Sequence, residues 1–307
     1  MRVLVTRRIL PEGLAILKDA GFDVEVHNSE SPMDPDKSRK TAQGCDGLLC
    51  MLNDPIDRDL LENSQLKVIA NHAVGTDNVD LLSAEEFDIV VTNTPGVLTE
   101  ATADLAMALL LATARRIVEA DAYLRAGRFE GWAPTMFVGA SLSGKTLGIV
   151  GAGRIGQAVA RRAEAFGMRI LMRGSRDGAP LSQILAESDF LSLHCPLTPK
   201  THHLIGAEQL RAMKSTAVLI NTARGPVVDE AALVEALQKG WIAAAGLDVF
   251  EKEPKVHPGL LSMRNVVLLP HIGSADQETR RKMSIIAAQS VVDVLEGRRP
   301  VHQVRVS

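Results

Sequence analysis

The stretch Thr146–Gly156 constrains the fold of this chain more than any other segment, because it joins an apolar run to the pattern Gly-x-Gly-x-x-Gly. The run Thr146–Val150 contains β-branched residues and predicts a strand, and the apolar spacing in Gln157–Phe166 predicts a helix. A strand, tight turn and helix start of this kind bind the pyrophosphate of a dinucleotide at the helix N-terminus. The alternative is a glycine-rich turn in an ordinary α/β protein. The strand before and the helix after favour the dinucleotide site.

The three glycines of this pattern have different expected roles. Gly151 permits the turn, Gly153 lets a pyrophosphate approach the backbone, and Gly156 lets the helix pack closely on the strand.

The chain length and charge limit the remaining possibilities. A chain of 307 residues suits two domains, and a net charge of −3 without any basic block gives no reason to propose nucleic acid or a membrane surface as a partner. The apolar runs are all shorter than the roughly 18 residues of a membrane span, and Arg7 and Arg8 interrupt the N-terminal one. Three scattered cysteines lack zinc-ligand spacing. We therefore expect a cytoplasmic protein with a small substrate and no metal site.

Short apolar runs alternate with helical stretches in both halves of the chain, which predicts an α/β fold with parallel sheets covered by helices. A long helix from about Glu100 to Arg125 is expected to link the two series, and a last helix from Asp276 to Leu295 to return to the first domain. Ser29–Lys40 is expected to be a loop or a short exposed helix. The expected strands are Arg2–Thr6, Asp23–His27, Asp46–Cys50, Lys67–Asn71, Ile89–Asn93, Thr146–Val150, Met168–Met172, Asp189–His194, Thr216–Asn221, Ala243–Asp248 and Asn265–Leu269.

The residues after the strand Met168–Met172 indicate which dinucleotide is bound. An acidic residue that accepts from the ribose hydroxyls is expected about twenty residues after the glycines, but the chain has Arg173, Gly174, Ser175 and Arg176 there. Asp177 is the first acid, and we expect it to lie beyond the ribose. Arginine and serine side chains suit a ribose 2′-phosphate, so NADPH is predicted over NADH, with NAD still possible. The alternative is a solvated loop.

Three candidate reacting groups follow the ends of later strands. Arg224, Glu253 and His271 are all expected at the edge of the sheet where α/β proteins bind ligands. An imidazole protonates the oxygen of a carbonyl that receives hydride, a carboxylate orients the ring, and a guanidinium holds a substrate carboxylate. Singly, each has an ordinary explanation as a surface ion pair, a solvated loop charge or a loop histidine. Their common location after a glycine motif favours catalysis.

The chain resembles the D-isomer-specific 2-hydroxyacid dehydrogenase family over essentially its whole length. The resemblance implies a flavodoxin-like substrate domain from residues 1–98 and 276–307, a Rossmann NAD(P) domain from residues 99–275, a cleft between these doubly wound domains, and a homodimer. The motifs that carry it are Asn71–Asn78, Asn93–Asp104, Gly151–Gly156, Asn221–Pro226, Gly246–Pro254 and Pro270–Ser274.

The resemblance also implies residue roles. Arg224 binds and polarises the substrate, His271 is the acid/base, and Glu253 rather than Glu251 pairs with the histidine. Backbone N–H groups of Val74 and Gly75 would hold the substrate carboxylate, with Leu52 lining the pocket. Thr102 and Asp248 are expected near the nicotinamide, although Thr102 could instead bond within its own helix. Cys195 is expected to line the adenosine site, not to act as a nucleophile. The remaining expected cofactor contacts are Arg154, Ile155, Pro196 and Thr222.

Within the family, the segment Trp132–Gly139 and the basic loop 173–176 are similar to the glyoxylate and hydroxypyruvate reductases. This likeness implies that Trp132 reaches into the substrate pocket of a partner subunit; the alternative is a linker tryptophan buried at a domain or dimer contact. His72 is either an accessory contact or a loop histidine. The expected activity is NADPH-dependent reduction of glyoxylate and hydroxypyruvate. Alternatives are a dehydrogenase for 2-ketogluconate or 3-phosphoglycerate, and a dinucleotide-sensing protein like the C-terminal-binding corepressors.

Overall fold

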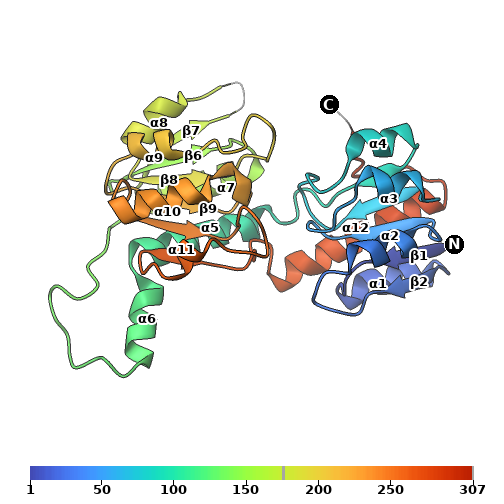
Figure 1. Cartoon of the computed structure of the whole chain (residues 1–307), viewed down its shortest axis with the longest axis horizontal. Coiled ribbons are helices and arrows are strands. Elements are labelled where there is room, and N and C mark those ends of the chain that lie inside the picture. Colours follow the sequence, from blue (N-terminus) through green and yellow to red (C-terminus); the bar gives the residue numbers. More distant parts are fainter. Residues whose placement is uncertain (175–176, 306–307) are drawn as a thin grey trace. The chain divides into compact units, whose positions relative to one another are not determined.

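The computed structural model describes residues 1–174 and 177–305, which form two compact units (Figure 1). Unit 1 comprises Met1–Leu98 and Ser274–Ser307, and unit 2 comprises Thr99–Gly273. The second boundary therefore lies two residues before the expected one. None of the helices in the described residues is long and apolar enough to cross a membrane.

Unit 1 contains a parallel sheet that has five strands in the described residues, in the order β2-β1-β3-β4-β5. This order is that of the flavodoxin-like fold, so the expectation from the βα alternation is confirmed. The strand order reverses between β1 and β3, because β2 lies on one side of β1 and the later strands lie on the other. Flavodoxin-like folds have a crevice at the point of reversal. The strands are β1 (Arg2–Val5), β2 (Asp23–Val26), β3 (Gly47–Cys50), β4 (Val68–Asn71) and β5 (Val90–Thr92).

Helices cover both faces of this sheet. On one face, α1 (Pro11–Asp19) and α12 (Gln277–Leu295) share an apolar cluster with the strands, although they come from opposite ends of the chain. On the other face lie α2 (Pro35–Ala42), α3 (Arg58–Glu62) and α4 (Leu81–Glu86). The polar segment Ser29–Lys40, expected as a loop or a short exposed helix, thus contains the start of α2. Asp34 caps this helix by accepting from the Lys37 N–H.

Unit 2 contains a second all-parallel sheet, whose described strands number six in the order β11-β10-β9-β8-β6-β7. The helices α5 and α7 cover one face, and α8, α9 and α10 cover the other. In this sheet, the strand order reverses between β6 and β8. The strands are β6 (Thr146–Val150), β7 (Arg169–Arg173), β8 (Phe190–Leu193), β9 (Val218–Asn221), β10 (Ala244–Leu247) and β11 (Val266–Leu268). The helices are α5 (Thr99–Ala114), α6 (Ile117–Arg125), α7 (Arg154–Ala165), α8 (Leu181–Glu187), α9 (Ala207–Ala212), α10 (Glu230–Lys239) and α11 (Pro258–Leu261), with a 3-10 turn at Gly225–Val227.

The expectation of one continuous helix from Glu100 to Arg125 is wrong, because the helix breaks between α5 and α6. Arg116 adopts the left-handed conformation with φ of 54°. The carbonyl of Ala114 accepts a hydrogen bond from Ala140 N at 2.9 Å, so the returning chain takes the place of the next helical turn. Gly139 packs so closely that a Cβ atom there would lie 2.2 Å from the Ala114 oxygen.

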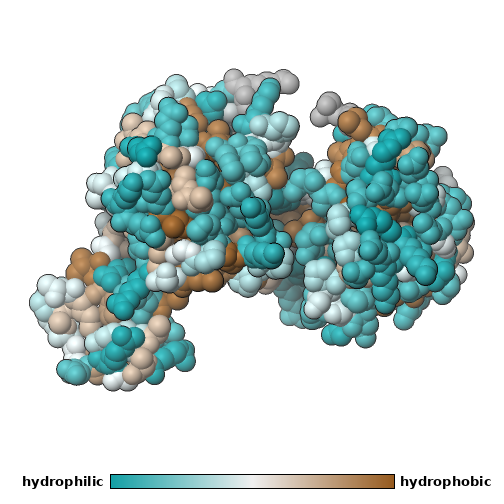
Figure 2. Space-filling model, viewed as in Figure 1, coloured by the Kyte–Doolittle hydropathy of each residue, from teal (hydrophilic) through white to brown (hydrophobic). Residues whose placement is uncertain are grey.

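The helix α6 and the segment after it project from the rest of unit 2 (Figure 1). No residue of α6 is buried, and Ile117, Val118 and Leu124 are all more than half exposed. Hydrophobic residues stand out on this projection among polar ones (Figure 2). Trp132 is 81% exposed. Within the single chain, therefore, it is not the buried linker tryptophan of the alternative interpretation.

Candidate functional site

The glycine turn in unit 2 has the geometry that the sequence predicts. Gly151 follows the buried strand β6 with φ of 109°, and a Cβ there would lie 2.4 Å from the His194 carbonyl carbon. A Cβ at Gly156 would lie 2.0 Å from the Gly151 oxygen, so only glycine lets α7 approach the turn. By contrast, a Cβ at Gly153 would meet no described atom within 4 Å. The first helical turn is thus open on the side from which a pyrophosphate approaches.

The end of β7 combines a basic and an acidic side chain. Arg173 ends the strand, and its carbonyl accepts a hydrogen bond from Gly151 N at 2.9 Å, which places it beside the glycine turn. Asp177 lies closer than the sequence suggests, because its Oδ1 is 2.2 Å from where a Cβ of Gly174 would be. The Gly174 N–H donates to the Asp177 carbonyl at 2.9 Å, which holds this turn. Ser175 and Arg176, the other expected phosphate contacts, lie outside the described residues.

Two buried polar atoms on the same edge of the sheet have no protein partner in the part of the chain that the structure describes. Within the described residues, Thr222 Oγ1 and Asp248 Oδ2 have no hydrogen bond. Asp248 Oδ1 accepts from Ile272 N at 2.7 Å, and burial raises the pKa of this carboxyl group. A side chain at Gly273 would lie 3.3 Å from Asp248 Oδ2 and 3.5 Å from Thr102, so these two residues are neighbours. Buried polar atoms of this kind fit the amide and hydroxyl groups of a dinucleotide.

Cys195 follows β8, next to the glycine turn. Burial raises the pKa of its thiol to about 11, so the sulfur is protonated at neutral pH. This supports the expectation that the thiol lines a site and does not attack a substrate. Arg154 and Pro196 are exposed, and Ile155 is half-buried.

Arg224 is set in a tight loop after β9. The Asn221 side chain closes the loop by donating to the Arg224 carbonyl at 2.9 Å and accepting from Ala223 N at 3.0 Å. Gly225 lies against the loop after β10, because a Cβ there would lie 1.8 Å from the Phe250 oxygen. This role of Gly225 was not predicted from the sequence. The close approach places the Arg224 loop directly beside the backbone that leads to Glu253.

Glu253 and His271 form the expected pair. Glu253 Oε2 lies 2.9 Å from His271 Nδ1, and its Oε1 accepts from Phe250 N at 3.0 Å. Both side chains are about one-quarter exposed. Because the carboxylate occupies Nδ1, Nε2 is the nitrogen that is left to exchange a proton with a substrate. Glu251 instead accepts from the Glu230 N–H, which agrees with the choice of Glu253.

The surroundings of Glu253 favour its charged form. Burial alone would raise its pKa, but the hydrogen bond and charge of His271, the Phe250 N–H and the charge of Arg224 outweigh burial and lower the pKa. Glu253 is therefore a carboxylate at neutral pH and stabilises a positive charge on the neighbouring ring.

Replacing Glu253 with glutamine should lower kcat/KM for carbonyl reduction by roughly tenfold or more. The neutral amide keeps the shape of the side chain but loses the charge-assisted contact with His271 Nδ1, which contributes about 1.5–3 kcal/mol. Glu251→Gln is the matched control and should leave kcat/KM nearly unchanged, because Glu251 contacts the Glu230 N–H instead. A loss of activity in Glu251→Gln but not in Glu253→Gln would show that the wrong glutamate was assigned.

In unit 1, the loop after β4 carries Val74 and Gly75, both of which are half-buried. In the described part of the chain, neither N–H group donates to another protein group. Leu52, also half-buried, lies in the turn after β3. Such a pair of unbonded backbone N–H groups is suited to a carboxylate.

His72, in the same loop, is a buried histidine that joins the loop to α12. Its Nε2 lies 3.1 Å from Ser284 Oγ, and this hydroxyl donates to the Arg280 carbonyl. The ring nitrogen is therefore the donor. Burial, and then the charge of Arg280, lower the His72 pKa to about 4, so the ring is neutral at physiological pH. The geometry favours a structural role over substrate contact.

Together, a dinucleotide turn, a glutamate–histidine pair and an arginine on one sheet edge are the parts of a nicotinamide-dependent oxidoreductase. The family model described as D-isomer specific 2-hydroxyacid dehydrogenase, NAD binding domain, matches residues 107–273. A glyoxylate reductase of Korarchaeum cryptofilum is 49% identical over 97% of this chain and 94% of that protein. The chain belongs to the D-isomer specific 2-hydroxyacid dehydrogenase family.

Solved structures agree with this assignment. A protein of Thermus thermophilus superposes with a TM-score of 0.94 and 48% identity, covering 99% of this chain and 100% of that one. An NADPH-dependent glyoxylate/hydroxypyruvate reductase from Sinorhizobium meliloti, crystallised with NADP and malonate, gives a TM-score of 0.88 at 39% identity, covering 99% and 96%.

Proposed function

We propose that the protein is an NADPH-dependent reductase that converts glyoxylate and hydroxypyruvate into the corresponding 2-hydroxy acids. The observation that carries the proposal is the 2.9 Å contact between His271 and Glu253 on the sheet edge that also holds Arg224 and the glycine turn. The glyoxylate reductases among its relatives support the choice of a small 2-oxo acid.

In the proposed reaction, bound nicotinamide supplies the hydride. Arg224 pairs with the substrate carboxylate and polarises the neighbouring carbonyl through its planar set of donors. His271 donates its Nε2 proton to the carbonyl oxygen, which gains charge during reduction. Glu253 keeps the ring oriented through Nδ1 and stabilises its protonated form.

Other residues bind the two ligands. Thr102, Thr222 and Asp248 offer polar atoms to the nicotinamide end of the cofactor, and Cys195 and Pro196 line the adenosine end. Unit 1 contributes the N–H groups of Val74 and Gly75 to the substrate carboxylate, with Leu52 against its carbon chain. The glycine turn and the first residues of α7, Gly151, Gly153, Arg154, Ile155 and Gly156, hold the pyrophosphate.

NADPH preference is supported by the end of β7, which has Arg173 and Gly174 where an acid would bind the ribose hydroxyls of NADH. The relative from Sinorhizobium meliloti is described as NADPH-dependent. The Asp177 carboxylate lies against Gly174 and weakens this preference, because it would repel a 2′-phosphate.

A panel of 2-oxo acids with both cofactors tests the proposal. We expect glyoxylate and hydroxypyruvate to give the highest kcat/KM, with NADPH preferred. Arg173→Ala should lower kcat/KM for NADPH by roughly tenfold and leave NADH nearly unchanged, since a charge-assisted phosphate contact contributes about 1.5–3 kcal/mol. Asp177→Asn should raise kcat/KM for NADPH. A clear NADH preference of the unmodified protein would contradict the cofactor assignment.

The same panel separates the alternatives. A preference for 2-ketogluconate or 3-phosphoglycerate would identify a dehydrogenase of a larger acid. Cofactor binding without any turnover would instead indicate a dinucleotide-sensing protein.

We also propose a cytoplasmic homodimer. The exposed apolar side chains of α6 and the segment after it, including Leu124 and Phe129, form a surface that a second copy would cover, and Trp132 would then reach the substrate pocket of that copy. Light scattering should give twice the 33.0 kDa chain mass. A monomer at micromolar concentration would contradict the dimer.

A further inference from the structure

The loop after β4 has three consecutive carbonyl groups that each accept a hydrogen bond. The carbonyl of Ala73 accepts hydrogen bonds from Thr94 N at 2.8 Å and Thr94 Oγ1 at 3.1 Å. The carbonyl of Val74 accepts from the Asn93 side chain at 2.8 Å, and that of Gly75 accepts from the Asn71 side chain at 2.8 Å. All three carbonyls therefore have partners within unit 1.

These contacts decide where the N–H groups point. A trans peptide is planar, so its N–H points away from its carbonyl. Holding the carbonyls of Ala73, Val74 and Gly75 therefore fixes the directions of the N–H groups of Val74, Gly75 and Thr76, each opposite to its own carbonyl. In the residues that the structure describes, none of these three N–H groups donates to a protein acceptor. These fixed N–H groups, which have no protein acceptor in the described residues, are available to bind an anion.

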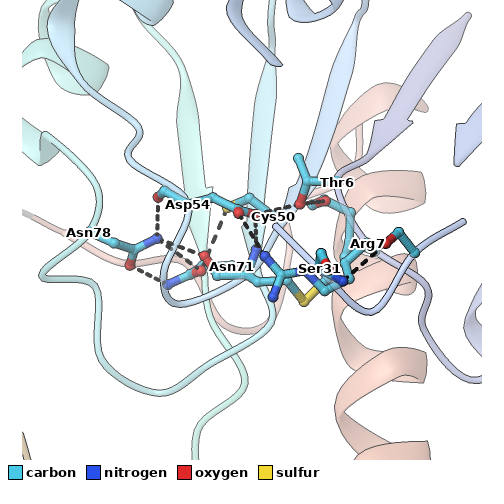
Figure 3. A network of polar contacts seen from close by, with 10 residues as sticks. Thr6, Arg7, Ser31, Cys50, Asp54, Asn71 and Asn78 are labelled. Atoms are coloured by element: carbon cyan, nitrogen blue, oxygen red, sulfur yellow. Dashed lines mark hydrogen bonds and ion pairs between the residues drawn. The ribbon is translucent and has the colours of Figure 1, made fainter. Parts of the chain in front are cut away.

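One of the anchoring side chains, Asn71, is itself fixed by a second layer of contacts (Figure 3). Asn71 is fully buried, and its amide also donates to Asn78 Oδ1 at 3.0 Å. Asn78 in turn donates to the carbonyls of Met51 and Asp54 at 3.0 and 3.1 Å. The network thus ties the loop after β4 to the turn after β3 that carries Leu52.

Asp54 holds the other end of this network. Its buried carboxylate accepts from Met51 N at 2.8 Å and from Thr6 Oγ1, and it lies 3.3 Å from Arg7. Thr6 and Arg7 follow β1, and Asp54 follows β3, so these groups fill the crevice at the change of direction of the sheet. This buried polar cluster thus lies beside the anchored loop, because β3 and β4 are paired neighbours in the sheet.

We infer that Asn71, Asn93 and Thr94 are positioning residues that orient three backbone N–H groups, including Thr76 N–H, toward the substrate carboxylate. The inference rests on the proposed function, since that function assigns a carboxylate to this loop. It adds a third donor and names the side chains that set the direction of all three. Unlike Arg224, these side chains act only through the backbone.

The experiment compares leucine variants of three asparagines, because leucine has the same branched shape, cannot donate a hydrogen bond and adds no charge. Asn93→Leu and Asn71→Leu each remove one carbonyl anchor. Asn63→Leu is the matched control, since its amide also donates to a backbone carbonyl, that of Asp59 at 3.2 Å, but at the end of α3. The measurements are KM and kcat for glyoxylate, and the inhibition constant of oxamate, a carboxylate that is not reduced.

We expect Asn93→Leu and Asn71→Leu to raise KM for glyoxylate and the inhibition constant of oxamate about tenfold, corresponding to one lost anchor. The change in kcat should be about threefold or less, because the acid/base pair lies in unit 2. Asn63→Leu should change neither. If Asn71→Leu fails to fold, Asn93→Leu alone decides, since Asn93 is partly exposed. Values for Asn93→Leu equal to those of Asn63→Leu would overturn the inference.

Amide NMR separates this inference from the proposed function. Oxamate added to the NADPH-bound protein should shift the resonances of Val74, Gly75 and Thr76, and Asn93→Leu should weaken this response. If the response is present but glyoxylate is not reduced, the proposed function fails and the inference stands. If glyoxylate is reduced but these three resonances do not move, the inference fails.

Discussion

Replacing His271 with alanine should lower kcat for glyoxylate reduction by about 10²–10⁴-fold, which is the usual contribution of a positioned general acid. The ring is the proton donor in the proposed reaction, and its Nδ1 is held 2.9 Å from Glu253. The cofactor dissociation constant, measured from NADPH fluorescence, should stay nearly unchanged because the glycine turn is not altered. Rapid-mixing kinetics with saturating NADPH would measure the change in the chemical step directly.

His27→Ala is a suitable control for this experiment, because His27 follows β2 in unit 1 and has no role in the proposed reaction. It should leave kcat within about twofold, because His27 lies outside the glycine turn and the three reacting groups. An unchanged kcat in His271→Ala would refute the assignment of the acid. A drop in kcat that is equally large in both variants would point to a loss of folded protein instead.

Arg224→Lys should lower kcat/KM for glyoxylate by about 10²–10³-fold, even though the positive charge is kept. A lysine has a single ammonium group and cannot match both oxygens of a carboxylate, nor can it reach the carbonyl at the same time. We expect KM to rise and kcat to fall, because the guanidinium is proposed to bind the ground state and to polarise the carbonyl. Steady-state kinetics with glyoxylate and NADPH measure both effects.

The matched control is Arg169→Lys. Arg169 begins β7, at the opposite edge of the sheet from Arg224, and pairs with Glu187 on an exposed surface. Exposed ion pairs contribute little, so this variant should keep its activity. If Arg224→Lys is as active as Arg169→Lys, the guanidinium is not the carboxylate and carbonyl contact that we propose.

Much of the fold could be predicted from the sequence, because each parallel strand is a short apolar run next to a helical pattern. The break between α5 and α6 could not, since nothing in the residues around Arg116 interrupts a helix. It arises where Ala140, distant in sequence, supplies the N–H that bonds to the Ala114 carbonyl. Local patterns do not reveal a contact that the chain makes only after it has turned back.

The candidate site shows the same division. Arg224, Glu253 and His271 could be selected because each follows a strand, and strand ends share one edge of a parallel sheet. The position of Asp177 against Gly174 could not be foreseen, because it depends on how the turn after β7 closes. The asparagine anchors carried a usable signal, since Asn71 ends β4 and Asn93 follows β5 directly.

The discontinuity of unit 1 has a consequence for how the chain matures during translation. Unit 2 is continuous and can fold as soon as Gly273 has left the ribosome. Unit 1 cannot complete its core then, because Ala288 and Val291 of α12 pack against the same face of the sheet as Val3 and Val68. The apolar strands of unit 1 are synthesised first, but α12, which covers them, is synthesised last. During that interval, this apolar face is uncovered and open to aggregation.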